Sequence, residues 1–177
     1  MKTITNLFIT LLLTATLVSC NEKPTKDVSV PAPKVEETVN LSQEEASVRE
    51  TMKKYKDAIQ NLTTEGTFEL FTPYATVFEQ GKVEGTYKDY IDGHLGPELG
   101  HFKSFTFSDY EIETTVNLPH AFTTENYLYT IVLKEDKARG TKERTIESKG
   151  VATSILEKID GTWKIIHSHT SFKKLNQ

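Results

Sequence analysis

The sequence has few cysteines, little net charge and no basic run. Cys20 is the single cysteine among 177 residues, so no disulfide within the chain can support the fold. With a formal net charge of −4, the chain lacks the excess of positive charge that is typical of nucleic-acid-binding proteins. The chain also lacks a Gly-rich phosphate loop, a nucleophile motif and a set of cysteine ligands. We therefore expect no nucleic-acid binding, no phosphoryl or covalent chemistry, no metal and no cofactor.

The apolar run at the start of the chain is too short to span a membrane. Leu7–Val18 falls below the roughly 20 residues that a membrane-spanning helix needs, and threonines interrupt it. Lys2 precedes this run, and a positive start before a short apolar segment is typical of an export signal.

The end of this apolar run carries the motif Leu17-Val18-Ser19-Cys20, which resembles the lipobox of bacterial lipoproteins. The resemblance implies that Cys20 receives a lipid and that residues 1–19 are a signal peptide cut off before it. Several acyl chains on one residue give stable anchoring. We predict a lipid-anchored protein of the bacterial cell envelope that faces outside the cytoplasm. An ordinary secretory signal, with Cys20 incidental, is the alternative.

Residues 20–40 form a separate segment of different composition. After the cysteine they contain three prolines, alternating charges and no aromatic residue. Such a segment buries too little apolar surface to offset its ordering entropy. We predict a flexible tether over 20–40 and one domain over 41–177.

The domain begins with residues at helical spacing. An apolar stripe from Val48 to Leu62 recurs every three or four positions and predicts a helix that ends near Asn61. Ser42, with Glu45 three residues later, predicts the cap of its first turn.

Two shorter helices are predicted after it. Thr64 can cap one that ends at Pro73. Thr86, with Asp89 three residues later, predicts the start of another, which Gly96-Pro97 breaks or tightens.

The second half of the domain changes to a period of two, which is typical of strands. Asp160-Gly161 is a hairpin signal between the last two strands. Helices first and strands afterwards indicate an α+β fold with helices on one face of an antiparallel sheet. The predicted long strands are Phe105–Val116, Ala121–Leu133, Glu143–Lys158 and Trp163–Phe172.

This order of elements, with the closing block Gly150–Ser171 (GVATSILEKIDGTWKIIHSHTS), resembles the superfamily of nuclear transport factor two, ketosteroid isomerase and the SnoaL-like cyclases. The resemblance covers about residues 44–173. It implies a cone-shaped fold, in which a strongly curved sheet wraps helices around a pocket. The same cone serves enzymes, binding proteins and oligomerisation domains, so it does not define the function.

The resemblance to the isomerase also implies site residues. The tyrosine that binds the substrate oxygen matches Tyr55, and the general-base aspartate matches about Glu79. The protonated aspartate of the isomerase falls near Ala152, which cannot donate a hydrogen bond. A pocket arginine of the related kinase association domain is replaced by Thr170.

Tyr55, Glu79, His94 and His169 are the predicted pocket residues. The structural alternatives are a core tyrosine for Tyr55, a solvated turn carboxylate for Glu79 and a satisfied core histidine for His169. His94 would share a helix face with Glu98 and His101, a plausible metal half-site if the helix were continuous.

Strand alternation places the closing-strand histidines, His167 and His169, on one face with Trp163. Such a pair suits zinc or copper, but the resemblance favours a polar pocket role. Which face of this strand lines the pocket is left open by the sequence.

Three functions remain open. The first is binding of a small, largely apolar molecule by a membrane-tethered domain. The second is an acid–base enzyme, such as an isomerase, cyclase or hydrolase, that uses the same pocket. The third is a dimerisation or interaction domain without a ligand, and a homodimer is expected in any case. A cavity of a few hundred Å³ with converging polar groups favours the first two, and a packed interior favours the third.

Overall fold

The computed structural model describes residues 40–175. The predicted signal peptide and lipid-anchored Cys20, like nearly all of the predicted tether, lie outside these residues. Within the described part of the chain, no helix is long and apolar enough to cross a membrane.

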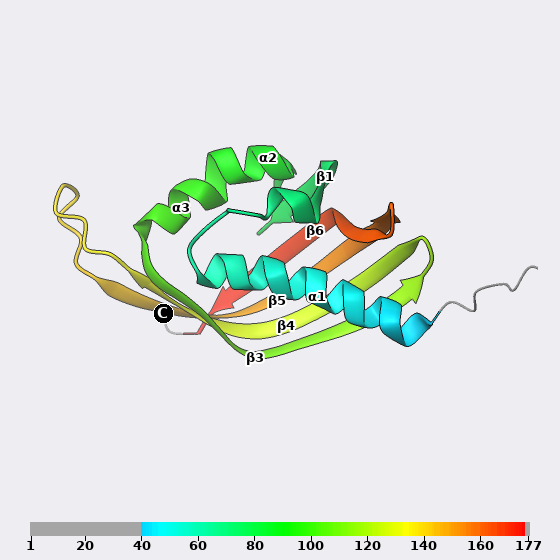
Figure 1. The fold of residues 1–177 in the computed structure, drawn as a ribbon. Coiled ribbons are helices and arrows are strands. Elements are labelled where there is room, and N and C mark those ends of the chain that lie inside the picture. The colour runs from blue at the N-terminus through cyan, green and yellow to red at the C-terminus, as the bar shows by residue number, and fades with distance from the viewer. Residues whose placement is uncertain (1–39, 176–177) are drawn as a thin grey trace, which may run out of the picture. The chain divides into compact units, whose positions relative to one another are not determined.

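The first helix, α1 (Leu41–Gln60), lies along the concave side of the sheet (Figure 1). Its extent confirms the helix predicted from the apolar stripe. The predicted cap at Ser42 is wrong, because Asn40 caps the helix and accepts a hydrogen bond from the Gln43 backbone N–H at 3.3 Å. The first turn is fixed by Glu44, which accepts hydrogen bonds from two groups of the sheet. Ser42 lies inside this turn rather than before it. The donors to Glu44 are Lys158 Nζ at 2.6 Å and Trp163 Nε1 at 3.0 Å.

The second predicted helix is reduced to one short turn, η1 (Phe68–Leu70). The prediction that it continues to Pro73 is wrong, because the first strand begins at Phe71 and includes this proline. Strand pairing is interrupted around Pro73, at the kind of irregularity where a strand tolerates proline.

The third predicted helix forms as one continuous helical segment of three parts. The predicted capping box is confirmed: the Thr86 side chain accepts from the Asp89 backbone N–H, and Asp89 accepts from the Thr86 backbone N–H. Gly96-Pro97 does not break the segment, since Pro97 lies at the first positions of its last part, where proline is tolerated. The three parts are α2 (Tyr87–Tyr90), the π-helical turn η2 (Ile91–Leu95) and α3 (Gly96–His101).

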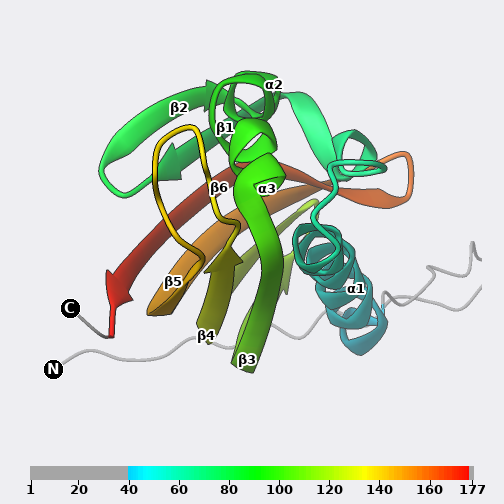
Figure 2. The same cartoon turned by 90° about the vertical axis from the view of Figure 1, so that its left-hand side faces the viewer.

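Six strands form one sheet in the order β2-β1-β6-β5-β4-β3. Neighbouring strands are antiparallel except β1 and β6, which pair in parallel. The sheet curls around α1 and the α2–α3 segment to give an open cone (Figure 2), which confirms the predicted fold class. The strands are β1 (Phe71–Glu79), β2 (Lys82–Thr86), β3 (Phe102–Asn117), β4 (His120–Leu133), β5 (Arg144–Ile159) and β6 (Thr162–Lys174).

The buried core fills only part of the cone. Val48 and Met52 of α1 pack in it with Leu156 and Ile165 of the sheet, and all four are buried. Further along α1, Tyr55 borders a cavity instead. The interior is therefore packed at one end of the helix and hollow at the other.

Candidate functional site

The cone encloses a cavity of about 500 Å³. It lies between the concave face of the sheet, the second half of α1 and the α2–α3 segment. Its walls are mostly aromatic and aliphatic, which is the usual make-up of a small-molecule site. This hollow interior is the feature that favours a ligand-binding or catalytic domain over a purely interacting one.

The floor of the cavity is a set of aromatic rings on β3, β4 and β6. Phe105 stacks on Tyr129 with ring centroids 5.3 Å apart, and Phe172 meets Tyr129 edge-on at 5.9 Å. Phe107 meets Tyr127 edge-on at 5.0 Å. Offset and edge-on contacts of this kind are the favourable aromatic geometries, so the rings support one another as a preformed apolar surface.

One glycine keeps part of this floor flat. Gly150 lies opposite Tyr127 in the β4–β5 pairing, and a Cβ at this position would come within 2.2 Å of the Tyr127 ring. The ring therefore lies on the bare backbone of β5. A larger residue would push Tyr127 toward the cavity.

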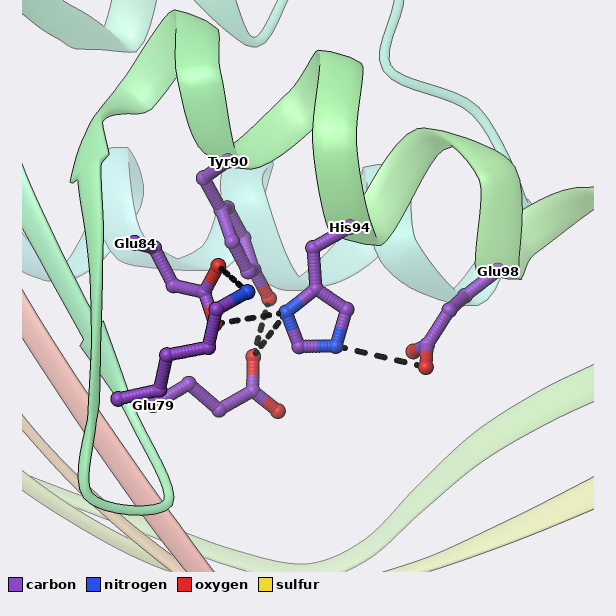
Figure 3. Close-up of polar contacts among 6 residues, drawn as sticks. Glu79, Glu84, Tyr90, His94 and Glu98 are labelled. Carbon is purple, nitrogen blue, oxygen red and sulfur yellow. Dashed lines mark hydrogen bonds and ion pairs between the residues drawn. The ribbon is translucent and has the colours of Figure 1, made fainter.

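The polar wall of the cavity begins with Glu79 at the end of β1 and Tyr90 in α2. The Tyr90 hydroxyl donates a hydrogen bond of 2.7 Å to Glu79 Oε2 (Figure 3). Burial raises the pKa of Glu79 above its ordinary value, and the bond from Tyr90 only partly offsets this. Burial likewise raises the pKa of Tyr90 well above its ordinary value, so the hydroxyl keeps its proton. The Glu79 carboxyl group therefore accepts a hydrogen bond from a hydroxyl group that keeps its proton.

His94 stands beside this pair, between two further carboxylates (Figure 3). Its Nδ1 lies 2.9 Å from Glu84 Oε1 and 3.9 Å from Glu79 Oε2, and its Nε2 lies 3.4 Å from Glu98 Oε1. Burial alone would raise the pKa of Glu84, but its hydrogen bonds with Lys82 and His94 outweigh burial and lower it. Glu84 is thus an ionised partner that orients the imidazole ring.

Two irregularities of the backbone build this wall. In the β1–β2 pairing Val77 faces Gly85 and Phe78 faces Val83, so Glu84 is the extra residue of a bulge. Bulges re-aim side chains next to functional sites. The second irregularity is the π-helical turn η2, which contains His94, and such turns occur frequently at functional sites.

Three of the four predicted pocket residues meet at the cavity: Tyr55, Glu79 and His94 all line it. The fourth does not, and the prediction that His169 lines the pocket is wrong. His169 is exposed on the other face of β6, next to the Phe78 ring. The cause is a bulge in β6, where Ile165 pairs with Leu156 and His167 with Ile155, so that the alternation shifts by one residue at Ile166. Beyond the bulge, Thr170 and Phe172 face the cavity instead.

Tyr90 and Glu84 were missed by the sequence reasoning. Tyr90 carries a readable signal, since it precedes His94 by four positions and so shares its helix face. Glu84 carries none, because only the bulge turns it toward the histidine. Glu98 was noted as a neighbour of His94, and the continuous helical segment does bring the two together.

A second buried carboxyl group, Glu125 on β4, lies on the concave face outside the cavity lining. It accepts a hydrogen bond of 2.6 Å from the Tyr110 hydroxyl, and burial raises its pKa. In the β4–β5 pairing Glu125 lies opposite Ala152, the position at which the isomerase has a hydrogen-bond donor. Across residues 40–175, no group of three or more acidic, histidine or cysteine side chains is arranged to hold a metal ion.

A curved sheet wrapped around helices is the cone fold of the nuclear transport factor 2-like class. Similar solved structures include a nuclear transport factor 2-like superfamily protein from Salmonella enterica (19% identity, TM-score 0.61, covering 77% of this chain and 94% of that one). A candidate ketosteroid isomerase from Shewanella frigidimarina is 26% identical (TM-score 0.57, 69% and 92%). A candidate scytalone dehydratase from Novosphingobium aromaticivorans is 16% identical (TM-score 0.59, 75% and 85%).

Within this class the chain belongs to the SnoaL-like domain family, whose model matches residues 48–173. No curated protein sequence matches the chain.

Proposed function

We propose that the domain binds a small, largely apolar molecule in the cavity of its cone, on a protein that a lipid at Cys20 anchors in the bacterial cell envelope. The observation that carries the binding proposal is the cavity of about 500 Å³ with a preformed aromatic floor. Such a cavity suits an apolar body, because burying apolar surface is favourable and the rings need no rearrangement to receive it. Tyr90, Glu79 and His94 supply the few polar contacts that orient a ligand.

A fluorescent apolar probe tests the binding proposal. N-phenyl-1-naphthylamine is neutral and brightens when it leaves water, so titration with the full-length chain gives its affinity. Ile146 lines the cavity from β5, and Ile146→Trp should fill space and weaken probe binding at least tenfold. Thr145→Trp is the matched control, because the neighbouring residue is exposed.

Equal affinity of the two tryptophan variants would overturn the proposal that the probe binds in this cavity. Native mass spectrometry of protein purified from its own host is the complementary measurement, since a tightly bound natural ligand would co-purify with the protein.

An acid–base enzyme is the second candidate, and two contacts favour it. Burial raises the pKa of Glu79, and its carboxyl group faces the cavity, which suits a group that takes or gives a proton. His94, 2.9 Å from Glu84, is an imidazole oriented by a carboxylate, as a catalytic base requires. The similarity to structures named as an isomerase and a dehydratase supports this class of chemistry.

Proton exchange tests the enzymatic candidate without a known substrate. A panel of small cyclic ketones and β-hydroxy ketones is incubated with the protein in D₂O, and mass spectrometry reads deuterium uptake or loss of water. Glu79→Gln should abolish any uptake that the parent catalyses, whereas the exposed Glu113→Gln should leave it unchanged. Equal loss in both variants, or no loss in either, would contradict a role for Glu79.

The expected homodimer stays a prediction that sedimentation velocity can test.

A further inference from the structure

We propose that the ligand of the cavity is a small organic anion, whose charged end binds between Arg144 and Lys174. This inference rests on the proposed binding function and names the chemical class of the ligand. Arg144 is the first residue of β5 and Lys174 the last residue of β6, and both line the cavity. In the β5–β6 pairing Lys174 lies opposite Ser148, four residues along β5 from Arg144, and both side chains are exposed at the rim of the cavity.

The alternation of the strands accounts for both positions. Arg144 lies two residues from Ile146 on β5, and Lys174 lies two residues from Phe172 on β6. Ile146 and Phe172 both line the cavity, so each cation continues a row of side chains on the concave face. Their placement is therefore a property of the sheet and not of a loose surface loop.

The carboxylates of the polar wall already have partners. Glu79 accepts from Tyr90, Glu98 faces His94, and Glu84 faces both Lys82 and His94. In contrast, neither Arg144 nor Lys174 lies within ion-pair distance of an acidic side chain among residues 40–175. Within the described part of the chain, the two cations that line the cavity therefore have no acidic partner, although the whole chain carries −4.

These two side chains suit a carboxylate or a sulfonate. The planar guanidinium group of arginine can donate two parallel hydrogen bonds to such an anion, and the lysine ammonium adds a point charge. An apolar body attached to the anion would lie on the adjoining rings of Phe172 and Tyr129. The expected class is thus an aromatic or alicyclic acid with one apolar end.

A matched pair of probes tests the charge preference with the full-length chain. 8-Anilinonaphthalene-1-sulfonate has the same ring system as N-phenyl-1-naphthylamine and adds one sulfonate. We expect the sulfonate probe to bind at least tenfold more tightly than the neutral one. The double variant Arg144→Gln/Lys174→Gln should remove that advantage and leave the affinity of the neutral probe within twofold of the parent.

Lys149→Gln/Lys173→Gln is the control, because these exposed lysines pair across the same two strands but do not line the cavity. It removes the same net charge and should keep the preference for the sulfonate. If both double variants lose it equally, the attraction comes from general surface charge and the inference is wrong. Equal binding of the two probes to the parent would also overturn the inference while the proposed binding function stands. Failure of both probes to bind would overturn the binding function itself.

Discussion

Glu79 joins two properties that seldom occur together, a carboxyl group largely withdrawn from water and an open side facing a cavity. It comes from a strand end, whereas Tyr90 and His94 come from the helical segment, and the β1–β2 hairpin brings them together. A residue in this position is costly to ionise, and that cost is measurable as a dependence of stability on pH.

The first prediction is that Glu79→Gln makes the protein less sensitive to rising pH. The pKa of Glu79 is raised in the folded state above its ordinary value of 4.5, so the folded protein holds this proton more tightly than the unfolded chain does. The ionisable carboxyl therefore costs stability progressively as pH rises from about the unfolded value through the folded one. Urea unfolding at pH 4, 6 and 8 should show the parent losing stability relative to the variant. A difference that stays constant with pH would contradict the raised pKa.

The second prediction concerns the histidine that lies outside the cavity. His169 is exposed, so His169→Gln should change the free energy of unfolding by no more than about 0.5 kcal/mol and leave the affinity of N-phenyl-1-naphthylamine unchanged. His94→Gln, at the cavity wall, should alter probe binding. Thermal melts and probe titrations of the two variants make the comparison. If His169→Gln weakened probe binding and His94→Gln did not, His169 and not His94 would face the cavity.

At the scale of elements, regular patterns could be read from the sequence and irregular ones could not. The period of two predicted the strands from Phe105 onward, and Thr86 with Asp89 predicted the helix start that the structure confirms. The β6 bulge at Ile166 depends on how neighbouring strands align, so alternation within one strand wrongly placed His169 on the same face as Trp163. Tyr55 and Glu79 could be named from the isomerase resemblance, whereas Glu84 could not, because only a bulge in the β1–β2 pairing turns it toward His94.

The third prediction is that Gly96→Ala distorts the turn that carries His94. A Cβ at Gly96 would come within 2.5 Å of the Ile91 carbonyl oxygen, the acceptor of the π-helical bond from the Gly96 N–H. Because backbone must move to relieve this contact, we expect a loss of about 1–3 kcal/mol of stability. Probe binding should weaken as well.

Gly93→Ala is the control for this prediction, since nothing lies within 4 Å of a Cβ at that position of the same turn. Alanine there should be neutral or stabilising by up to about 1 kcal/mol, as expected from helix propensity. Urea unfolding of both variants makes the comparison. Equal effects would show that the π-helical geometry does not require glycine at position 96.

For the whole molecule, the curved sheet and its helices follow from the order of predicted elements, whereas the size of the cavity does not. Its volume depends on which side chains meet across the cone, such as Tyr127 over Gly150, and these contacts join distant parts of the chain. The membrane tether, in turn, is a prediction from residues 1–40 alone.

The fourth prediction tests that tether. Cys20→Ala removes the only thiol that can carry the lipid, so the protein should move from the membrane fraction to the soluble exported fraction. Fractionation followed by immunoblotting measures this change, with Ser42→Ala as a control that leaves the lipobox intact. Sedimentation of the Cys20 variant with membranes would mean that something other than a lipid holds the protein there.

The parallel pairing of β1 with β6 sets the order in which the domain can be assembled. Strand β1 is made early, yet the neighbour that joins it to the rest of the sheet is the last strand of the chain. Contacts between residues so far apart in sequence form slowly, because a long loop must close first. As the chain emerges from the ribosome, the β3–β4–β5 meander can pair by itself, but the β1–β2 hairpin has no sheet to join until β6 appears. If the protein is exported as proposed, the domain stays incomplete until its final strand is free, which keeps the chain in the unfolded form that a narrow export channel accepts.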